Sequence, residues 1–352
     1  MTGSVAPKRL VVRATNWVGD AVMSLPALKE LRRRFPRAHL AVVARDWVAD
    51  LYRGQGLADE IFVIPRGRRS LHLAPRLRGF DCAILFQNAF EAALLAFLAR
   101  IPERCGYAVQ GRGWLLTHKV RPRAALQGKH QAYYYLDLLY RLGLTDRDFL
   151  AANDSPDISL RIPESAEERL AEVLQRHGVD YRLPLAALHP GAAYGPAKRW
   201  PAERFAALAD RLQERTELRV VFVGSSGERG LAEAIRRLMR TQPVLLHGET
   251  DLPMLLALFR RSRLVVTNDS GPMHLAAAAG APQIALFGST DEVATGPLNP
   301  RAVVIARHPE CSPCFRRTCP IDLRCFRSIT VEDVWAAAER ILQSGDGGTL
   351  PR

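Results

Sequence analysis

Residues 265–274, with the sequence VVTNDSGPMH, combine features that suit the binding of an anion. An apolar strand pattern ends in a short polar turn, and an Ala-rich helical pattern begins at once. Ser270 is a favoured N-cap residue, Gly271 lets a ligand approach the backbone, and Pro272 leaves the other N–H groups of the first turn free. Because a helix N-terminus carries partial positive charge, this turn is predicted to hold a diphosphate without a metal ion.

Two other residues of this segment each have two alternative roles. His274 lies one turn into the helix, where its imidazole could contact the same phosphates or pack between helices. Asp269 is electrostatically unfavourable beside an anion unless it orients loop N–H groups or accepts a hydrogen bond from a ligand hydroxyl, and helix capping is its alternative role. We therefore count both residues as candidate donor ligands.

Asp20 is the candidate catalytic base. It follows the first strand pattern in the sequence NWVGDA, residues 16–21, where Gly19 is expected to form a tight turn and Asp20 to project into a cleft between two domains. A glycosyl transfer that inverts the anomeric carbon needs a carboxylate to accept the proton of the acceptor hydroxyl. Capping of the following helix is the alternative role for Asp20.

Two more loops that follow strand patterns contain candidate nucleotide ligands. The loop HPGAAYGPAKRWP, residues 189–201, includes Lys198, which could reach a leaving diphosphate or lie at the surface as most lysines do. The segment GSSGE, residues 224–228, places Glu228 where its carboxylate could accept hydrogen bonds from ribose hydroxyls. A simple Gly/Ser turn is the alternative interpretation of this second segment.

Absent motifs narrow the class of enzyme. No GxGxxG follows the first strand pattern and no GxxxxGK[ST] occurs, which disfavours NAD-dependent dehydrogenases and P-loop NTPases. Residues 146–148, DRD, match the metal-binding DxD of some glycosyltransferases, but they do not follow a strand and we interpret the match as chance. The first residues lack a signal-peptide pattern and no segment is long and apolar enough to span a bilayer, so a cytoplasmic protein is predicted.

Composition indicates a globular, basic protein. The 352 residues suffice for two domains, since a single core seldom exceeds about 250–300 residues. The hydrophobic fraction of 48%, with 24% charged residues, excludes a disordered or fibrous chain. The net charge of +13 favours phosphates, nucleic acids or anionic lipids as partners, and short basic clusters predict a folded basic face.

Strand patterns rich in Val, Ile and Leu alternate with helical periodicity, which predicts the α/β class with parallel strands joined by helices. This rhythm is lost over residues 145–163, so we expect two Rossmann-like domains, 1–163 and 164–352, facing an interdomain cleft. The expected strands are 9–14, 39–44, 60–64, 81–86, 186–189, 219–223, 244–246, 264–267 and 283–287. The expected helices are 25–34, 46–53, 91–100, 132–142, 167–177, 202–214, 228–240, 252–261, 272–279 and 331–343; the last could belong to the C-terminal domain or pack back on the N-terminal one.

The sequence resembles the ADP-heptose:lipopolysaccharide heptosyltransferases, most closely those of type II, over nearly its whole length. The resemblance rests on NWVGDAVMSLPALKELRRRFP, LFQNAFEAALLAFLARIPERCGY and LHPGAAYGPAKRWPAERFAAL. Its most specific part is TNDSGPMHLAAAAGAPQIALFGSTD, followed closely by TGPLNP.

The resemblance implies a GT-B fold, with the acceptor on the N-terminal domain and the donor on the C-terminal one. It implies an inverting enzyme that needs no metal or other cofactor and uses ADP-heptose as donor, with Asp20 as base. The implied donor ligands are Lys198, Glu228, Asp269, Ser270, Gly271, Pro272 and His274.

The acceptor implied by the resemblance is heptosyl-Kdo2-lipid A at the cytoplasmic face of the inner membrane. The net charge of +13 suits this anionic acceptor and a peripheral contact with the membrane surface. The candidate acceptor contacts are Gly19, Arg66, Arg68, Arg69 and Arg112. For any single one of these arginines, a place on a solvated basic face is the favoured interpretation.

Four of the six cysteines are close together in the sequence, at Cys311, Cys314, Cys319 and Cys325. In a cytosolic protein such clustering can indicate a structural zinc site, but the spacing departs from paired CxxC motifs. Reduced, packed thiols or a single disulfide are the favoured interpretation. Cys82 and Cys105, in or near strand patterns, are predicted core residues.

Two other functions are alternatives. A GT-B transferase or a nucleotide-sugar epimerase with another donor would share the fold, and preference for UDP- over ADP-sugars would indicate it. A basic nucleic-acid-binding protein would share the charge and would bind DNA or RNA with steep salt dependence. No motif for nucleic-acid binding is present, so no nucleic-acid partner is expected.

Overall fold

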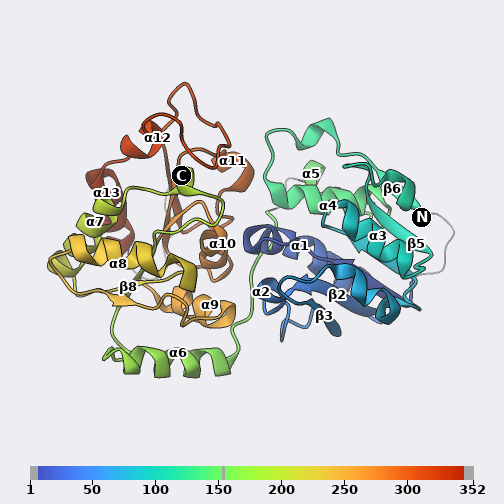
Figure 1. Cartoon of the computed structure of the whole chain (residues 1–352), viewed down its shortest axis with the longest axis horizontal. Coiled ribbons are helices and arrows are strands. Elements are labelled where there is room, and N and C mark those ends of the chain that lie inside the picture. Colours follow the sequence, from blue (N-terminus) through green and yellow to red (C-terminus); the bar gives the residue numbers. More distant parts are fainter. Residues whose placement is uncertain (1–6, 153–154, 345–352) are drawn as a thin grey trace. The chain divides into compact units, whose positions relative to one another are not determined.

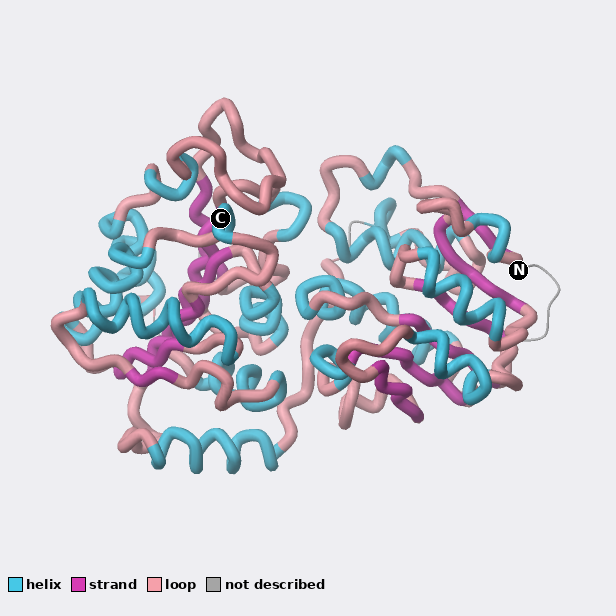
Figure 2. The backbone as a smooth tube through the Cα atoms, viewed as in Figure 1, coloured by secondary structure: helices cyan, strands magenta, loops and turns pink. Residues whose placement is uncertain are grey.

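The computed structural model describes residues 7–152 and 155–344. The chain forms two compact units that meet at the Arg161–Ile162 bond, close to the expected boundary after Pro163. Each unit is one sheet with helices on both faces (Figures 1 and 2). The two units are described separately below.

The first unit contains a parallel sheet in the order β3-β2-β1-β4-β5-β6. Its strands are β1 (Arg9–Arg13), β2 (His39–Arg45), β3 (Glu60–Ile64), β4 (Cys82–Leu85), β5 (Glu103–Tyr107) and β6 (His118–Val120). Its helices are α1 (Val18–Arg34), α2 (Asp46–Ala49), α3 (Phe90–Leu98), α4 (Gln131–Arg141) and α5 (Phe149–Ala152), with short 3-10 helices η1 (Ser70–Leu77), η2 (Gly113–Leu115) and η3 (Ala124–Leu126). Helices α1 and α4 pack together, and α3 packs with η1.

The second unit contains a parallel sheet in the order β12-β11-β10-β7-β8-β9. Its strands are β7 (Leu185–His189), β8 (Arg219–Phe222), β9 (Val244–Leu245), β10 (Leu264–Asn268), β11 (Gln283–Phe287) and β12 (Ala302–Ala306). Its helices are α6 (Glu164–Arg176), α7 (Ala202–Arg215), α8 (Arg229–Leu238), α9 (Leu252–Arg261), α10 (Gly271–Ala278), α11 (Glu292–Thr295), α12 (Arg324–Arg327) and α13 (Val331–Gln343), with η4 (Pro196–Lys198) and η5 (Ser226–Glu228). Strands β7, β10 and β11 are buried along their whole length, as expected for a sheet covered on both faces.

Both sheets have the strand order of a Rossmann fold. Numbered within its own unit, each sheet runs 3-2-1-4-5-6, and the order reverses between the first and fourth strands. In the first unit the reversal lies between β1 and β4, and in the second it lies between β7 and β10. Ligands of such sheets bind beyond the carboxyl ends of the strands at this switch point.

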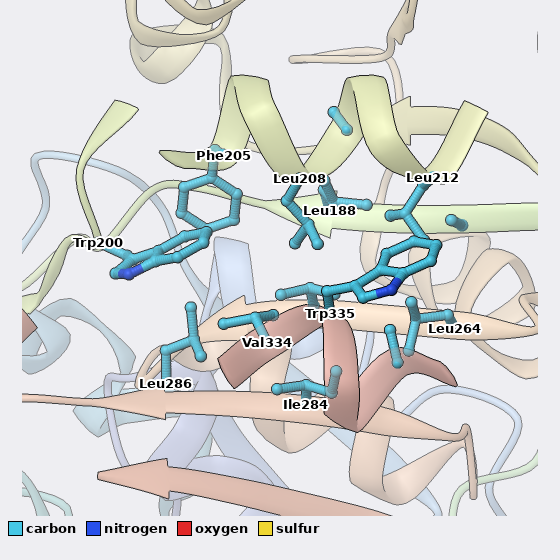
Figure 3. Close-up of a cluster of buried hydrophobic side chains, with 14 of the residues drawn as sticks. Leu188, Trp200, Phe205, Leu208, Leu212, Leu264, Ile284, Leu286, Val334 and Trp335 are labelled. Atoms are coloured by element: carbon cyan, nitrogen blue, oxygen red, sulfur yellow. The ribbon is translucent and has the colours of Figure 1, made fainter. Parts of the chain in front are cut away.

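Helix α13 is part of the hydrophobic core of the second unit. Val334 and Trp335 of α13 pack against the sheet beside Leu208 and Leu212 of α7 (Figure 3). Trp200 lies in the same core, 5.1 Å from the ring of Phe205 between centroids. Of the two placements that the sequence left open for the last helix, the structure therefore has the C-terminal one.

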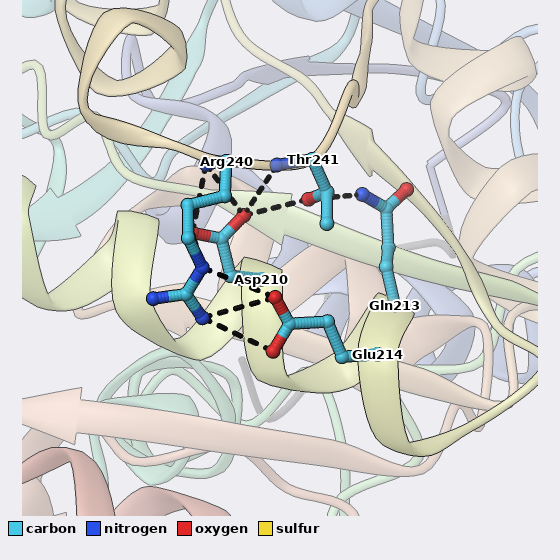
Figure 4. Close-up of polar contacts among 5 residues, drawn as sticks. All are labelled: Asp210, Gln213, Glu214, Arg240 and Thr241. Atoms are coloured by element: carbon cyan, nitrogen blue, oxygen red, sulfur yellow. Dashed lines mark hydrogen bonds and ion pairs between the residues drawn. The ribbon is translucent and has the colours of Figure 1, made fainter.

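A polar network fixes the segment that leads into β9. The buried carboxylate of Asp210 accepts hydrogen bonds from the backbone N–H groups of Arg240 and Thr241 and, at 2.7 Å, from the Thr241 hydroxyl (Figure 4). Gln213 donates to the same hydroxyl at 2.6 Å, and the Arg240 guanidinium pairs with Glu214 at 2.9 Å. These contacts connect α7 to the segment that precedes β9.

Several element boundaries differ from those expected. Helix α1 begins at Val18, not near Leu25, because Pro26 lies inside the helix and does not mark its first turn. Residues 16–21 therefore do not form a loop with a tight turn at Gly19, as expected; Gly19 and Asp20 are helical. The strands β5, β6 and β12 were not predicted from the sequence, since β5 and β6 are short and rich in polar residues and β12 is only partly buried at an edge.

Candidate active site

Lys198 and Asp269 form an ion pair at the switch point of the second sheet. Lys198 ends η4 in the loop that follows β7, and Asp269 comes directly after β10. The Lys198 Nζ lies 2.5 Å from Asp269 Oδ2, and both side chains are largely buried. Thr290, which follows β11, donates its hydroxyl to the same carboxylate oxygen at 2.5 Å. Asp269 therefore holds the ammonium group of Lys198 at the strand-end edge.

The first turn of α10 lies beside this pair. Ser270 is the N-cap residue, as predicted, but its hydroxyl makes no hydrogen bond to an N–H group of the helix. The hydroxyl instead donates to Asn268 O at 3.0 Å and lies 3.2 Å from His189 Nδ1. Gly271 and Pro272 are the first two helical residues, and the first turn contains no acidic side chain. The N-terminal dipole of α10 is thus not neutralised by a charge of its own turn.

Glu228 and His189 extend the site along the edge of the sheet. Glu228 accepts hydrogen bonds from the backbone N–H and the hydroxyl of Ser225 at 2.9 and 2.8 Å, in a capping box, and lies 3.8 Å from His189 Nε2. Burial alone would raise the pKa of Glu228, but His189 and Ser225 lower it to about 2. Gly191 makes this packing possible, since a Cβ atom there would lie 1.9 Å from Glu228 Oε1. His189 connects Ser270 to Glu228, so the structure brings four of the seven predicted donor residues, 198, 228, 269 and 270, into one cluster.

His274 lies inside α10, and its side chain is buried. It is thus placed where the sequence located it, one turn into the helix, and both roles considered for it are compatible with burial.

Asp20 lies in the first turn of α1, at the switch point of the first sheet. Its partly exposed carboxylate is near Tyr135 of α4, where burial and then the charge of Asp20 raise the pKa of the phenol well above its ordinary value. The turn before α1 is held by Arg13, whose guanidinium donates to Asn16 Oδ1 at 2.8 Å, and by Trp47, which donates to Asn16 O at 2.8 Å. Asp20 is therefore held on rigid backbone.

The predicted acceptor arginines fall into two groups. Arg66, Arg68 and Arg69 are exposed in the loop between β3 and η1, as a basic face requires. Arg112, in contrast, is completely buried, and its guanidinium donates to Asn88 Oδ1 at 2.9 Å and to two backbone carbonyls. Burial lowers the pKa of Arg112 to about 10. The placement of Arg112 on a solvated face was wrong, since its side chain ties together the loops after β4 and β5.

Comparison with known proteins identifies the family. Residues 68–324 match the profile of glycosyltransferase family 9 (heptosyltransferase). The chain belongs to glycosyltransferase family 9. It is 31% identical to the lipooligosaccharide heptosyltransferase 2 of Haemophilus ducreyi over 84% of this chain and 88% of that protein. Its identity to the lipopolysaccharide heptosyltransferase 2 of Escherichia coli is also 31%, over 84% of this chain and 87% of that protein.

Solved structures place the fold in the same family. The E. coli ADP-heptose lps heptosyltransferase II superposes with a TM-score of 0.82 at 28% identity, covering 96% of this chain and 100% of that one. A family 9 glycosyltransferase from Veillonella parvula gives the same TM-score at 26% identity, covering 96% of this chain and 98% of that one. The expected GT-B fold is confirmed, and the chain is a glycosyltransferase.

In this family member, a cysteine-containing segment supports the loop that carries Lys198. We call residues 307–323 the cysteine loop. Ala197 N–H donates to Arg317 O at 3.0 Å, and the Tyr194 hydroxyl donates to Phe315 O at 2.7 Å. Gly195 passes so close that a Cβ atom there would lie 2.4 Å from Arg317 O. The position of Lys198 therefore depends on the cysteine loop, which sequence reasoning did not connect to the site.

All six cysteines are free thiols. Cys311, Cys314, Cys319 and Cys325 line one small cavity together with Ala197. Over residues 7–152 and 155–344, no three His, Cys, Asp or Glu side chains are placed so that they could hold a metal ion. Cys82 and Cys105 are buried as expected, with their sulfur atoms 3.7 Å apart.

In the DRD sequence, residues 146–148, the carboxylate of Asp148 forms an ion pair with Arg123 at 2.8 Å.

His247 is another part of this edge that the sequence did not single out. It follows β9 and is buried, and neither ring nitrogen has a hydrogen-bond partner in the described part of the chain. Its ring lies against Gly224, where an added Cβ atom would be 2.7 Å from it and 3.1 Å from Glu228 Oε2. Burial, with the nearby His189, lowers the pKa of His247 to about 4. Its position after a strand at the carboxyl edge was the one available signal.

Proposed function

We propose that this glycosyltransferase moves L-glycero-D-manno-heptose from ADP-heptose to the heptosyl-Kdo2-lipid A inner core of lipopolysaccharide, with inversion at the anomeric carbon. The observation that carries the proposal is the Lys198–Asp269 pair beside the start of α10, which has no acidic residue in its first turn. The relatives named heptosyltransferase 2 support the choice of sugar and acceptor.

On the donor side, the leaving group is ADP. The Lys198 ammonium and the first N–H groups of α10, beginning with Gly271, would bind the diphosphate and stabilise the negative charge that grows on it. His274 would add a contact from the same helix. Glu228, whose low pKa keeps it ionised, would accept hydrogen bonds from the ribose hydroxyls.

On the acceptor side, Asp20 is the base. Its carboxylate accepts the proton of an acceptor heptose hydroxyl as that oxygen attacks the anomeric carbon of the donor. The new bond joins the acceptor oxygen to that carbon, and the bond from the carbon to the diphosphate oxygen breaks, so that ADP leaves with the electron pair. Gly19, Arg66, Arg68 and Arg69 would contact the acceptor, whereas the buried Arg112 would only shape the loops.

We propose that transfer needs no metal ion or other cofactor, because a lysine and a helix N-terminus supply the positive charge at the diphosphate. No helix of the described residues is long and apolar enough to cross a membrane. We propose a cytoplasmic enzyme that meets its anionic, membrane-held acceptor through peripheral contact, helped by the net charge of +13.

The test combines donor choice with transfer. Thermal shifts with ADP-, UDP- and GDP-sugars should show stabilisation by the ADP-sugar, of about 2.7 kcal/mol at 100 times its dissociation constant. ADP release should then require an acceptor that already carries one heptose, and EDTA should not reduce the rate. A preference for UDP-sugars, or equal rates with acceptors that lack heptose, would refute the assignment.

A further inference from the structure

The first unit carries an exposed aromatic cluster that the proposed chemistry does not use. Phe90, Phe97 and Leu98 of α3 are 40%, 46% and 44% exposed, and Trp114 of η2 is 69% exposed. The Trp114 ring centroid lies 6.1 Å from that of Phe90 and 6.5 Å from that of Phe97. Single exposed apolar residues are ordinary, but side chains in mutual contact form a patch, and such patches mark interaction sites.

The sequence of α3, FEAALLAFL, explains the patch. Ala92, Ala93, Leu95 and Ala96 are buried against the first sheet. Phe90, Leu94, Phe97 and Leu98 follow the spacing i, i+4, i+7, i+8, which is a second apolar stripe on the same helix. A helix that is apolar all round is normally covered on every side. Here Leu94 packs against the core, whereas Phe90, Phe97 and Leu98 remain exposed beside Trp114, which is exposed itself.

Basic side chains surround this patch. Glu91 in the first turn of α3 accepts a hydrogen bond from Ser70 N–H at 2.6 Å, which fixes the exposed basic loop of Arg66, Arg68 and Arg69 beside the helix. Arg69 is 74% exposed, with its Nε atom 3.7 Å from Glu91.

At the other end of α3, exposed Arg100 follows the helix and the Arg104 guanidinium lies over the Phe97 ring at 5.6 Å. Within residues 7–152, no ion pair is found for Arg66, Arg68 or Arg100.

We propose that Phe90, Phe97, Leu98 and Trp114 dock on the surface of an anionic lipid bilayer, with the surrounding arginines bound to lipid phosphates. Aromatic rings beside cationic side chains suit the interface between headgroups and acyl chains, which offers apolar contact and negative charge together. A second copy of the chain fits poorly, because a symmetric contact would bring the same arginines together.

The position of the patch also suits the proposed function, and this step of the inference rests on that function. Phe90 follows β4 and Trp114 follows β5, so the patch starts at the carboxyl edge of the first sheet. Asp20 lies at the same edge after β1, and β4 is the neighbour of both β1 and β5. Docking by this patch would bring a lipid-anchored acceptor to the edge that holds the base.

Vesicle flotation of the full chain tests the proposal. We expect binding to vesicles of phosphatidylcholine mixed with phosphatidylglycerol and little binding to phosphatidylcholine alone. The double variant Phe97→Ser, Trp114→Ser should bind the anionic vesicles about tenfold or more weakly, since it loses two inserted rings. Arg100→Glu should also weaken binding, whereas Leu238→Ser, which changes an equally exposed apolar residue of α8, should leave it unchanged.

A contact readout separates docking from a general loss of stability. Brominated phosphatidylglycerol should quench tryptophan fluorescence in the parent protein and much less in Trp114→Phe, which keeps an apolar ring and should still bind. Equal vesicle binding by the double variant and the parent would overturn the proposal, as would dimerisation through the patch without affinity for vesicles.

Transfer to a water-soluble, delipidated acceptor is measured in parallel and should be the same for the parent and the double variant. A parent protein that transfers heptose but does not bind anionic vesicles contradicts docking alone, and one that binds them but does not transfer contradicts the proposed function alone.

Discussion

The two sheets have the same strand order, but the helices at their switch points begin differently. In the first unit, α1 has Asp20 in its first turn, so the helix dipole already faces a negative charge. In the second unit, α10 has no acidic residue in its first turn, and the nearest carboxylate, Asp269, is paired with Lys198. The same architecture therefore presents a carboxylate in the first turn of α1 and a first turn without an acidic residue in α10.

This difference predicts which change stops the chemistry. Asp20→Asn keeps the shape of the side chain but cannot accept a proton, so turnover should fall by about a hundredfold to ten-thousandfold. The affinity for ADP-heptose should not change, because all the proposed donor ligands belong to the second unit. Asp146→Asn, at an exposed position of the first unit, is the control. If Asp20→Asn transferred heptose at the parent rate, Asp20 would not be the base, and the carboxyl edge of the first sheet would not supply the proton acceptor.

A smaller effect is expected at the other edge. Lys198→Ala removes the ammonium that Asp269 holds at the proposed diphosphate site, and a hydrogen bond to a charged group contributes about 1.5–3 kcal/mol. Calorimetric titration should show ADP-heptose bound about 10- to 100-fold more weakly. Lys129→Ala, which changes an exposed lysine of the first unit, should bind the donor like the parent. Unchanged affinity in Lys198→Ala would show that the diphosphate does not bind at this ion pair.

The sequence located individual residues better than it located their contacts. The sequence singled out Lys198, Asp269 and Ser270 because polar residues after apolar strands mark a ligand edge, and the structure places them at the carboxyl edge of the second sheet. The ion pair between residues 198 and 269 was not predictable from spacing, since it requires β7 and β10 to be neighbours. The division of the chain and most buried strands were predicted, because long apolar runs between helical patterns are a strong signal.

Other errors also have physical causes. Arg112 was expected at the surface because arginine is rarely buried, and its burial depends on acceptors at Gln87 and Asn88 in the loop after β4 and on the carbonyl of Tyr107 at the end of β5. The start of α1 was misplaced because proline is favoured in a first turn, although Pro26 lies inside the helix. The role of the cysteine loop depends on backbone contacts with Tyr194 and Ala197, which no sequence pattern reveals.

The buried imidazole of His247, at the carboxyl edge of the second sheet, predicts that the fold loses stability at low pH. The folded-state pKa of His247 is lowered to about 4, so the unfolded chain takes up this proton first. The contribution of His247 to stability is then complete above about pH 6.5 and is lost as the pH falls toward 4. Between pH 7.5 and 5 the loss should be about 2 kcal/mol.

Urea unfolding at both pH values, in the parent and in His247→Leu, measures this contribution as the difference between the two pH dependences. Glu228, with its pKa of about 2, titrates below this window, so it does not interfere. The other charges near His247 are His189, Arg229 and Glu233, and they are present in both proteins. The same pH dependence in both proteins would mean that the imidazole is protonated in the fold and that this edge is more hydrated than the structure indicates.

The smallest expected effect concerns the start of α10 itself. Replacing an N-cap serine or threonine by alanine usually costs about 1 kcal/mol, because a helix N–H loses its acceptor. Ser270 makes no such bond, so Ser270→Ala should change the free energy of unfolding by less than about 0.5 kcal/mol. Thr330→Ala is the matched control, since the Thr330 hydroxyl caps α13 by accepting from Asp333 N–H at 3.1 Å, and it should show the usual cost. If Ser270→Ala costs as much as Thr330→Ala, Ser270 caps α10 in solution, and fewer of the N–H groups of that turn are available to a diphosphate.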